Sequence, residues 1–245
     1  MAGMSSALHS ITIVGDQVQE AAEFYGRTFS APTVQDGASV DVDLHGVGRL
    51  RLEPGAGAAE GFPGFVVTYI LAQPGEVRAV MEAAARHGAE ILKPAKKALF
   101  GSFAGSFRSP DGVIWKLASQ SNKDTTAPSP SPKPLETTVI LGVSDPKKSV
   151  PFYVALGMTK DRDYGSKYID FLPEEGSVRL CLMQSPVLAK DVGHRGRRVD
   201  TPPLTLVRRS TVTDGGAATP VDGDAETVTD PDGFRWAASD EQPAR

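Results

Sequence analysis

Short runs in which apolar and polar residues alternate recur along most of this chain. Residues 40–44 and 49–52 alternate strictly, and 65–71 form an almost continuous apolar run. These patterns predict half-buried and fully buried β-strands. Residues 16–29 and 74–87 carry apolar side chains at helical spacing, and Asp16 is the predicted N-cap of the first helix. The pattern therefore predicts an α+β fold.

The second half of the chain repeats the first. Residues 109–119 read SPDGVIWKLAS and residues 230–239 read DPDGFRWAAS, so each contains a Pro-Asp-Gly turn followed closely by a Trp. A Phe-Tyr pair on a predicted helix precedes each turn, at Phe24-Tyr25 and Phe152-Tyr153. Self-similarity of this kind indicates an internal duplication.

A polar, Pro-rich segment separates the two copies. Residues 120–134 show no apolar periodicity, and we interpret them as a semi-extended linker between a first module, 1–119, and a second module, 135–245. The second module is shorter between its first helix and its final turn. We therefore expect a degenerate second module whose second helix is lost or shortened.

Composition excludes several classes of protein. The 245 residues are 40% hydrophobic with a net charge of −4, and no apolar run is long enough to span a bilayer. An acidic chain is not expected to bind nucleic acid. The sequence starts without a secretory signal pattern, and its single cysteine, Cys181, permits no internal disulfide, so a cytoplasmic location is expected.

The end of the first module carries an ordered set of motif residues: Lys93-Pro94-Ala95, Gly101, Phe103, Gly105, Phe107 and Pro110-Asp111-Gly112. In this order they resemble the vicinal oxygen chelate superfamily, which includes glyoxalase I, bleomycin-resistance proteins, extradiol dioxygenases and methylmalonyl-CoA epimerases. The resemblance implies two tandem βαβββ modules whose mixed sheets curl into a cup that holds a divalent metal.

The residues at the implied metal positions depart from the family pattern. The first-strand positions carry His9 and Thr138, and the last-strand positions carry Lys116 and Ala237. Only His9 is a good ligand, because a lysine repels a cation and an alanine offers no donor atom. The sequence therefore predicts a cup with no metal and no cofactor. An alternative set of substitute ligands stays open, drawn from His45, Asp41, Asp43 and Asp170.

The lining of the cup follows from strand alternation. A cup-facing His9 implies Ile11 and Ile13 beside it, and Lys116 implies Ile114. The full set of predicted ligand-binding residues is Ile11, Ile13, Phe100, Phe103, Phe107, Ile114 and Thr138, with His9 and Lys116 as the candidate catalytic residues. Each has a structural alternative: an inert His9, a Lys116 paired with a carboxylate, and phenylalanines that pack in the core.

Three functions are compatible with these residues. The first is a metal-free binding protein of the bleomycin-resistance type that sequesters an aromatic or amphipathic metabolite or antibiotic. The second is a metal-independent isomerase, lyase or cyclase in which His9 is the acid or base and Lys116 stabilises an oxyanion. The third is a metalloenzyme with substitute ligands. Both a monomer and a homodimer are compatible with the sequence.

Overall fold

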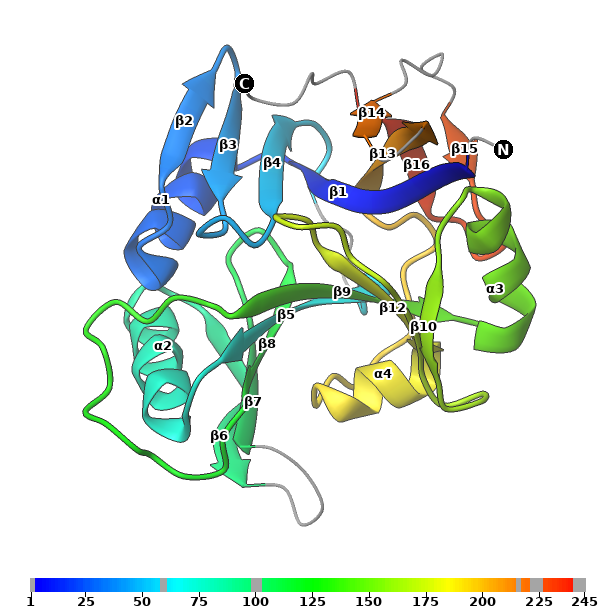
Figure 1. The fold of residues 1–245 in the computed structure, drawn as a ribbon. Helices are drawn as coiled ribbons and strands as arrows, with labels where there is room; N and C mark the ends of the chain where they lie inside the picture. Colours follow the sequence, from blue (N-terminus) through cyan, green and yellow to red (C-terminus); the bar gives the residue numbers. More distant parts are fainter. Residues whose placement is uncertain (1–2, 58–60, 98–102, 215–216, 221–226, 240–245) are drawn as a thin grey trace.

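Two mixed eight-stranded sheets form the body of the protein (Figure 1). The computed structural model describes residues 3–57, 61–97, 103–214, 217–220 and 227–239. Its helices and strands occur in the order expected of a duplicated α+β chain, with two strand–helix–strand units in the first half.

The first half comprises two βαβββ units. The first unit consists of β1 (Gly3–Gly15), α1 (Val18–Phe29), β2 (Thr33–Asp36), β3 (Ser39–Asp43) and β4 (Arg49–Pro54). The second consists of β5 (Phe65–Leu71), α2 (Pro74–Arg86), β6 (Glu90–Lys97), β7 (Phe103–Arg108) and β8 (Ile114–Ser119).

The second half begins with the same pattern and then departs from it. Its first unit consists of β9 (Glu136–Val143), α3 (Pro146–Ala155), β10 (Lys160–Asp163), β11 (Ile169–Phe171) and β12 (Arg179–Gln184), followed by a short helix, α4 (Ser185–Asp191). Its last unit consists of β13 (Leu204–Asp214), β14 (Ala217–Pro220), β15 (Val228–Thr229) and β16 (Arg235–Ala238). Among the described residues no helix follows β13, which pairs with β14, as expected of a second module whose second helix is lost or shortened. Helix α4 was not expected.

Each sheet takes strands from both halves of the chain. The first sheet has the order β15-β16-β13-β1-β4-β3-β2, and the second has the order β10-β11-β12-β9-β5-β8-β7-β6. An antiparallel pair joins the halves at the centre of each sheet, β1 with β13 and β5 with β9. The outer neighbours of these central strands pair in parallel. The two halves are thus joined by backbone hydrogen bonds in both sheets.

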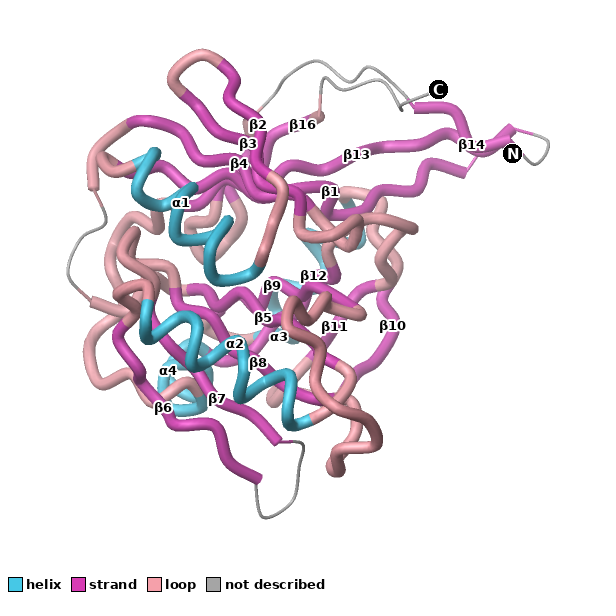
Figure 2. Tube along the Cα trace, turned by 90° about the vertical axis from the view of Figure 1, so that its left-hand side faces the viewer, coloured by secondary structure: helices cyan, strands magenta, loops and turns pink. Residues whose placement is uncertain are grey.

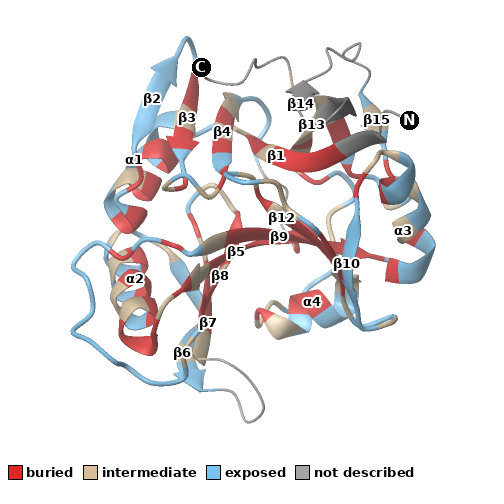
Figure 3. Ribbon diagram, in the orientation of Figure 1, coloured by how far each residue is buried: buried red, intermediate tan, exposed pale blue. Residues whose placement is uncertain are grey.

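The main core lies between the sheets, and α1 buries one face in it (Figures 2 and 3). The buried face of α1 carries Phe24, Tyr25 and Phe29 at helical spacing, as predicted. Both tryptophans, Trp115 and Trp236, are fully buried in this core against a tyrosine of a helix. Burial of aromatic side chains contributes much of the stability of such cores.

Helices α3 and α1 differ in whether a side chain caps the N-terminus. Asp145 caps α3, because its Oδ1 accepts from the backbone N–H of Lys147 at 3.0 Å. Gln17 takes the cap position of α1 and no side chain caps it, so the prediction of Asp16 as the cap is wrong. The Asp16 carboxylate lies against Gly57, whose absent side chain leaves room for it.

The linker packs against α2. Residues 120–134 contain no helix or strand. Asp124 accepts from the backbone N–H of Gly75 at 2.5 Å, and the Gln73 amide donates to the carbonyl of Thr126 at 3.0 Å. The segment therefore runs along the start of α2, and the module boundaries at 119 and 135 stay a prediction.

Candidate functional site

A β-bulge in β1 decides which side chains share a face with His9. The pairing of β1 with β13 shifts register between Leu8 and Ser10, so His9 is the extra residue. Leu8, Ile11 and Ile13 are buried in the core between the sheets. His9 and Ser10 face the opposite side. Strict alternation would have placed Ile11 and Ile13 beside His9, and the bulge removes them from its surroundings.

A hollow of about 760 Å³ lies beside this bulge, and we call it the first-sheet hollow. Its apolar lining comes from Pro32 and Val34, because the Val42 side chain is fully buried in the main core. Its polar lining consists of His9, Ser10, Asp41, Asp43, Arg49, Arg51, Glu175 and Arg209. Charged groups of both signs therefore converge on a space of small-molecule size.

The arginine at the centre of β4 is neutralised by its neighbours. The Arg51 guanidinium binds Asp36 at 2.7 Å, Asp41 at 3.0 Å and Glu53 at 3.0 Å. These carboxylates, Asp36 foremost, raise the pKa of Arg51. Three carboxylates therefore hold the Arg51 side chain in place where it lines the hollow.

His9 is bound to a second arginine. Nη2 of Arg209 lies 2.9 Å from Nε2 of His9. A guanidinium can only donate, so Nε2 of His9 is the acceptor and carries no proton. The neutral imidazole and the cation thus form one polar unit that joins β1 to β13.

Lys116 and Thr138 lie on the second sheet, on the face that α4 covers. There Ile114, Ile140, Cys181, Leu188 and Val192 form a small core of their own. Nζ of Lys116 lies 2.5 Å from Oδ2 of Asp191, at the end of α4. Thr138 is buried and donates to Glu136 at 3.1 Å. Lys116 therefore pairs with a carboxylate, one of the two alternatives considered for it.

Two of the three aromatic residues predicted to bind a ligand pack in or against the main core. Phe107 is fully buried in the main core, where its ring contacts Phe24. Phe103 packs against the same core beneath the Arg78 guanidinium, 5.1 Å from its ring centre. Phe100 lies outside the described residues.

His9 and Lys116 are not brought together. His9 belongs to β1 of the first sheet and Lys116 to β8 of the second. The main core lies between the two sheets. A single site that uses both side chains has no support from this geometry.

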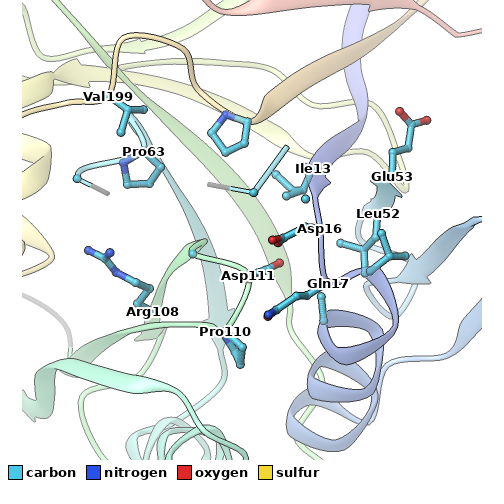
Figure 4. Close-up of a pocket in the computed structure, with 17 residues that line it drawn as sticks. Ile13, Asp16, Gln17, Leu52, Glu53, Pro63, Arg108, Pro110, Asp111 and Val199 are labelled. Carbon is cyan, nitrogen blue, oxygen red and sulfur yellow. The ribbon is translucent and has the colours of Figure 1, made fainter. Parts of the chain in front are cut away.

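A second pocket, of about 310 Å³, lies at the start of α1 (Figure 4). Asp16 and Asp111 point toward one another across it. Oδ2 of Asp111 accepts from the phenol of Tyr25 at 2.6 Å, and Oδ1 accepts from the hydroxyl of Ser109. Burial raises the pKa of Asp111 and, with the adjacent carboxylate, that of Tyr25. Because Tyr25 and Ser109 already bind the Asp111 carboxylate, we assign this pocket a structural role at the joint between α1 and the Pro-Asp-Gly turn.

Comparison with known proteins shows which sequences and structures this chain is similar to. Residues 7–117 match the sequence model of the Glyoxalase/Bleomycin resistance protein/Dioxygenase superfamily. The first half of the chain is therefore similar in sequence to this superfamily. The predicted resemblance to the vicinal oxygen chelate proteins is thereby confirmed. A search of curated proteins returns no match.

Solved structures extend the likeness to the whole chain. Glyoxalase I from Zea mays is 17% identical, with a TM-score of 0.56 over 96% of this chain and 92% of that one. A putative dioxygenase from Bacillus subtilis is 12% identical, with a TM-score of 0.57 over 96% and 86%. At these identities the likeness is one of fold, and the tandem two-module α+β fold is confirmed. No helix in the described parts is long and apolar enough to cross a membrane.

The donor atoms of the first sheet do not fit the divalent metal that the superfamily implies. Nε2 of His9 already accepts from Arg209, whose charge would repel a metal ion. The last strand of the sheet offers Ala237. Within the described residues, no group of three or more His, Cys, Asp or Glu side chains could hold a metal.

Each of the four candidate substitute ligands already binds another group of the protein. Asp41 binds Arg51, and the carboxylate of Asp43 accepts from the backbone N–H of Gly46 at 2.8 Å. His45 bonds through Nε2 to the carbonyl of Phe29 at 2.9 Å. Asp170 lies in the second sheet, buried against Arg162 at 2.6 Å, where the nearest cation is a guanidinium. A carboxylate with such partners is a poor metal ligand.

Sequence reasoning missed two features of this candidate site, Arg209 and helix α4. Arg209 lies far from His9 in the chain, and only the register of β1 with β13 brings them together. Helix α4 had a readable signal: Pro186 stands at its start, and Leu188 and Val192 are four residues apart on one face. Its seven residues are too few for periodicity to stand out.

Proposed function

We propose that this protein binds a small molecule in the first-sheet hollow without the help of a metal. The bond between Arg209 and His9 carries the proposal, because it occupies Nε2 of His9 and places a positive charge beside the ring that would repel a metal ion. The hollow, at about 760 Å³, is within the size range of small-molecule sites. Similarity to a superfamily that includes bleomycin-resistance proteins supports sequestration as the role.

The lining indicates the chemical class of the ligand. Pro32 and Val34 offer apolar contact, and Arg209 and Arg49 bring positive charge to the same space. We therefore propose an aromatic or amphipathic ligand with an anionic group. Guanidinium groups bind carboxylates and sulfonates through paired, charge-assisted hydrogen bonds.

The proposal includes a cytoplasmic location and no nucleic-acid partner. The one cysteine, Cys181, is buried and forms no disulfide, which is compatible with a reducing compartment. The metal-independent enzyme that would combine His9 with Lys116 receives no support, because these residues belong to different sheets.

Equilibrium binding tests the proposal. The probe is 8-anilinonaphthalene-1-sulfonate, an anionic aromatic dye whose fluorescence rises in apolar surroundings. We expect saturable one-to-one binding that weakens about tenfold or more in Arg209→Met, which corresponds to the loss of a charge-assisted contact. Arg27→Met is the matched control, because Arg27 lies exposed on α1 in a surface pair with Glu23.

Two results would count against it. One is the absence of saturable binding by the dye and by a panel of aromatic carboxylates, with the circular dichroism of a folded protein. The other is equal weakening in Arg209→Met and Arg27→Met, which would show that the dye binds the surface by charge alone. Binding that requires added Zn²⁺ would replace the proposal with a metal-dependent one.

A further inference from the structure

The end of α4 is held on the second sheet by three hydrogen-bond donors. Nζ of Lys116 donates to the Asp191 carboxylate at 2.5 Å, and Nζ of Lys93 donates to the Asp191 carbonyl at 2.6 Å. The hydroxyl of Ser106 donates to the carbonyl of Val192 at 2.7 Å. In Figure 1, α4 lies against the second sheet on the side away from the first sheet.

These donors belong to one row of cross-strand neighbours. Lys116 on β8 pairs in register with Ser106 on β7 and with Thr68 on β5. Thr68 pairs with Thr138 on β9, and Thr138 pairs with Arg179 on β12. Paired residues in adjacent strands point to the same face of a sheet. A single line of side chains therefore crosses five strands beneath α4.

The row is rich in donors. It contains two cations and three hydroxyl groups and no carboxylate of its own. Thr138 is satisfied by Glu136, and Arg179 binds Glu136 and Asp161. The hydroxyl of Thr68 has no partner among the described residues, although the residue is only 4% exposed. A buried polar atom with no partner is uncommon in folded proteins and calls for a ligand or another explanation.

Ordinary capping explains only part of this arrangement. Lysine and hydroxyl side chains often bind the last carbonyls of a helix, which accounts for Lys93 and Ser106. It does not account for the Asp191 carboxylate on Lys116, or for the unpartnered hydroxyl of Thr68 in the next strand. Lys116, which binds the Asp191 carboxylate, and Thr68, whose hydroxyl is unpartnered in the described part of the chain, are therefore neighbours in adjacent strands.

We propose that Lys116 and Thr68, with Ser106 and Lys93 beside them, form a binding site for a small carboxylate, and that Asp191 occupies this site from within the chain. Helix α4 then closes the site, and its Asp191 carboxylate takes the place of the ligand. The site lies on the second sheet and is independent of the hollow proposed for the first. Because Asp191 binds through its carboxylate, the expected ligand is also a compact carboxylate, one that a single ammonium and neighbouring hydroxyl donors can hold.

Chemical rescue tests the site. Asp191→Ala removes the internal carboxylate and leaves room for an added one. We expect sodium formate to raise the thermal midpoint of this variant by about 2 °C or more beyond the effect of sodium chloride at equal concentration, since a ligand that binds only the folded state stabilises it. The rescue should be absent in the Asp191→Ala/Lys116→Met double variant and in wild type. Asp200→Ala is the matched control, because Asp200 is 93% exposed.

A second measurement uses the unaltered chain. If Asp191 is a stand-in, malonate should compete with it and loosen α4, which limited trypsin cleavage after Lys190 would report as a faster rate than in matched chloride. Faster cleavage in wild type that disappears in Lys116→Met supports the proposal even if Asp191→Ala fails to fold. Formate effects of equal size in all variants, or cleavage unaffected by malonate together with no rescue of Asp191→Ala, would overturn it.

Discussion

Replacement of Tyr25 by Phe tests how much the buried hydrogen bonds of this residue stabilise the first half of the fold. The Tyr25 phenol is fully buried on α1 and donates to the Asp111 carboxylate at 2.6 Å, and it accepts from Nε1 of Trp115 at 3.4 Å. Tyr25→Phe deletes one oxygen and leaves the ring in place. Any loss of stability therefore measures these hydrogen bonds and little else.

The expected loss is about 2 kcal/mol. A hydrogen bond to a charged group contributes about 1.5–3 kcal/mol, and the long bond from Trp115 adds little. For a chain of this length, 2 kcal/mol lowers the thermal midpoint by roughly 4–8 °C. Guanidinium titration followed by tryptophan fluorescence gives the free energy of unfolding. Tyr164→Phe is the control, because Tyr164 is 62% exposed, and we expect a change within about 0.5 kcal/mol.

The stability loss caused by Tyr25→Phe should increase as the pH rises. Burial raises the pKa of Asp111 above its ordinary value of 3.8, so the folded state keeps this proton to higher pH than the unfolded state. The stability that Asp111 contributes is therefore complete below pH 3.8 and is lost as pH rises through its folded-state pKa. The Tyr25 bond lowers this pKa, so Tyr25→Phe raises it further. The deficit of the variant should be larger at pH 8 than at pH 4.5. A deficit below about 0.5 kcal/mol, or one equal at both values, would refute the reasoning.

Three further outcomes are expected. Protein purified without chelator should contain no stoichiometric metal, and Zn²⁺, Ni²⁺, Mn²⁺ and Fe²⁺ should leave its thermal midpoint unchanged, because the Arg209 guanidinium binds His9 and would repel a metal ion. A bound metal with clear stabilisation would contradict this. Leu188→Ala should cost about 2–5 kcal/mol in urea titrations because Leu188 is fully buried between α4 and the second sheet, whereas Val187→Ala, at a residue that is 47% exposed, should cost under about 0.5 kcal/mol. Burial raises the pKa of the Cys181 thiol, so a thiol reagent should react with it only after unfolding, and rapid labelling of the folded protein would contradict its placement.

Much of the fold could be predicted because its determinants are local. The stripe of α1, the alternation of β3 and β4, and the Pro-Asp-Gly turns are properties of short segments, and the structure confirms them. The duplication added long-range information, because the halves could be compared. What local patterns could not supply was the exchange of strands, in which each sheet combines strands from both halves.

The candidate site was less predictable because it depends on register. Alternation assigns faces correctly only along an uninterrupted strand. The bulge at His9 therefore moved Ile11 and Ile13 to the core, while the unbulged β8 kept Ile114 and Lys116 on one face as predicted. The extra residue of a bulge is set by the partner strand, here β13, which lies nearly two hundred residues away.

Helix α4 shows how tertiary packing can create an element that the sequence only weakly specifies. Seven residues are too few for a stable isolated helix, because nucleation costs more than so few hydrogen bonds return. Its stability must therefore come from Leu188 and Val192 against the second sheet, and from Lys116 and Lys93 at its end. Formation of the helix and closure of this face are then one event. A variant that weakens either contact should loosen both together, whereas the first-sheet hollow, which α4 does not touch, should keep its binding properties.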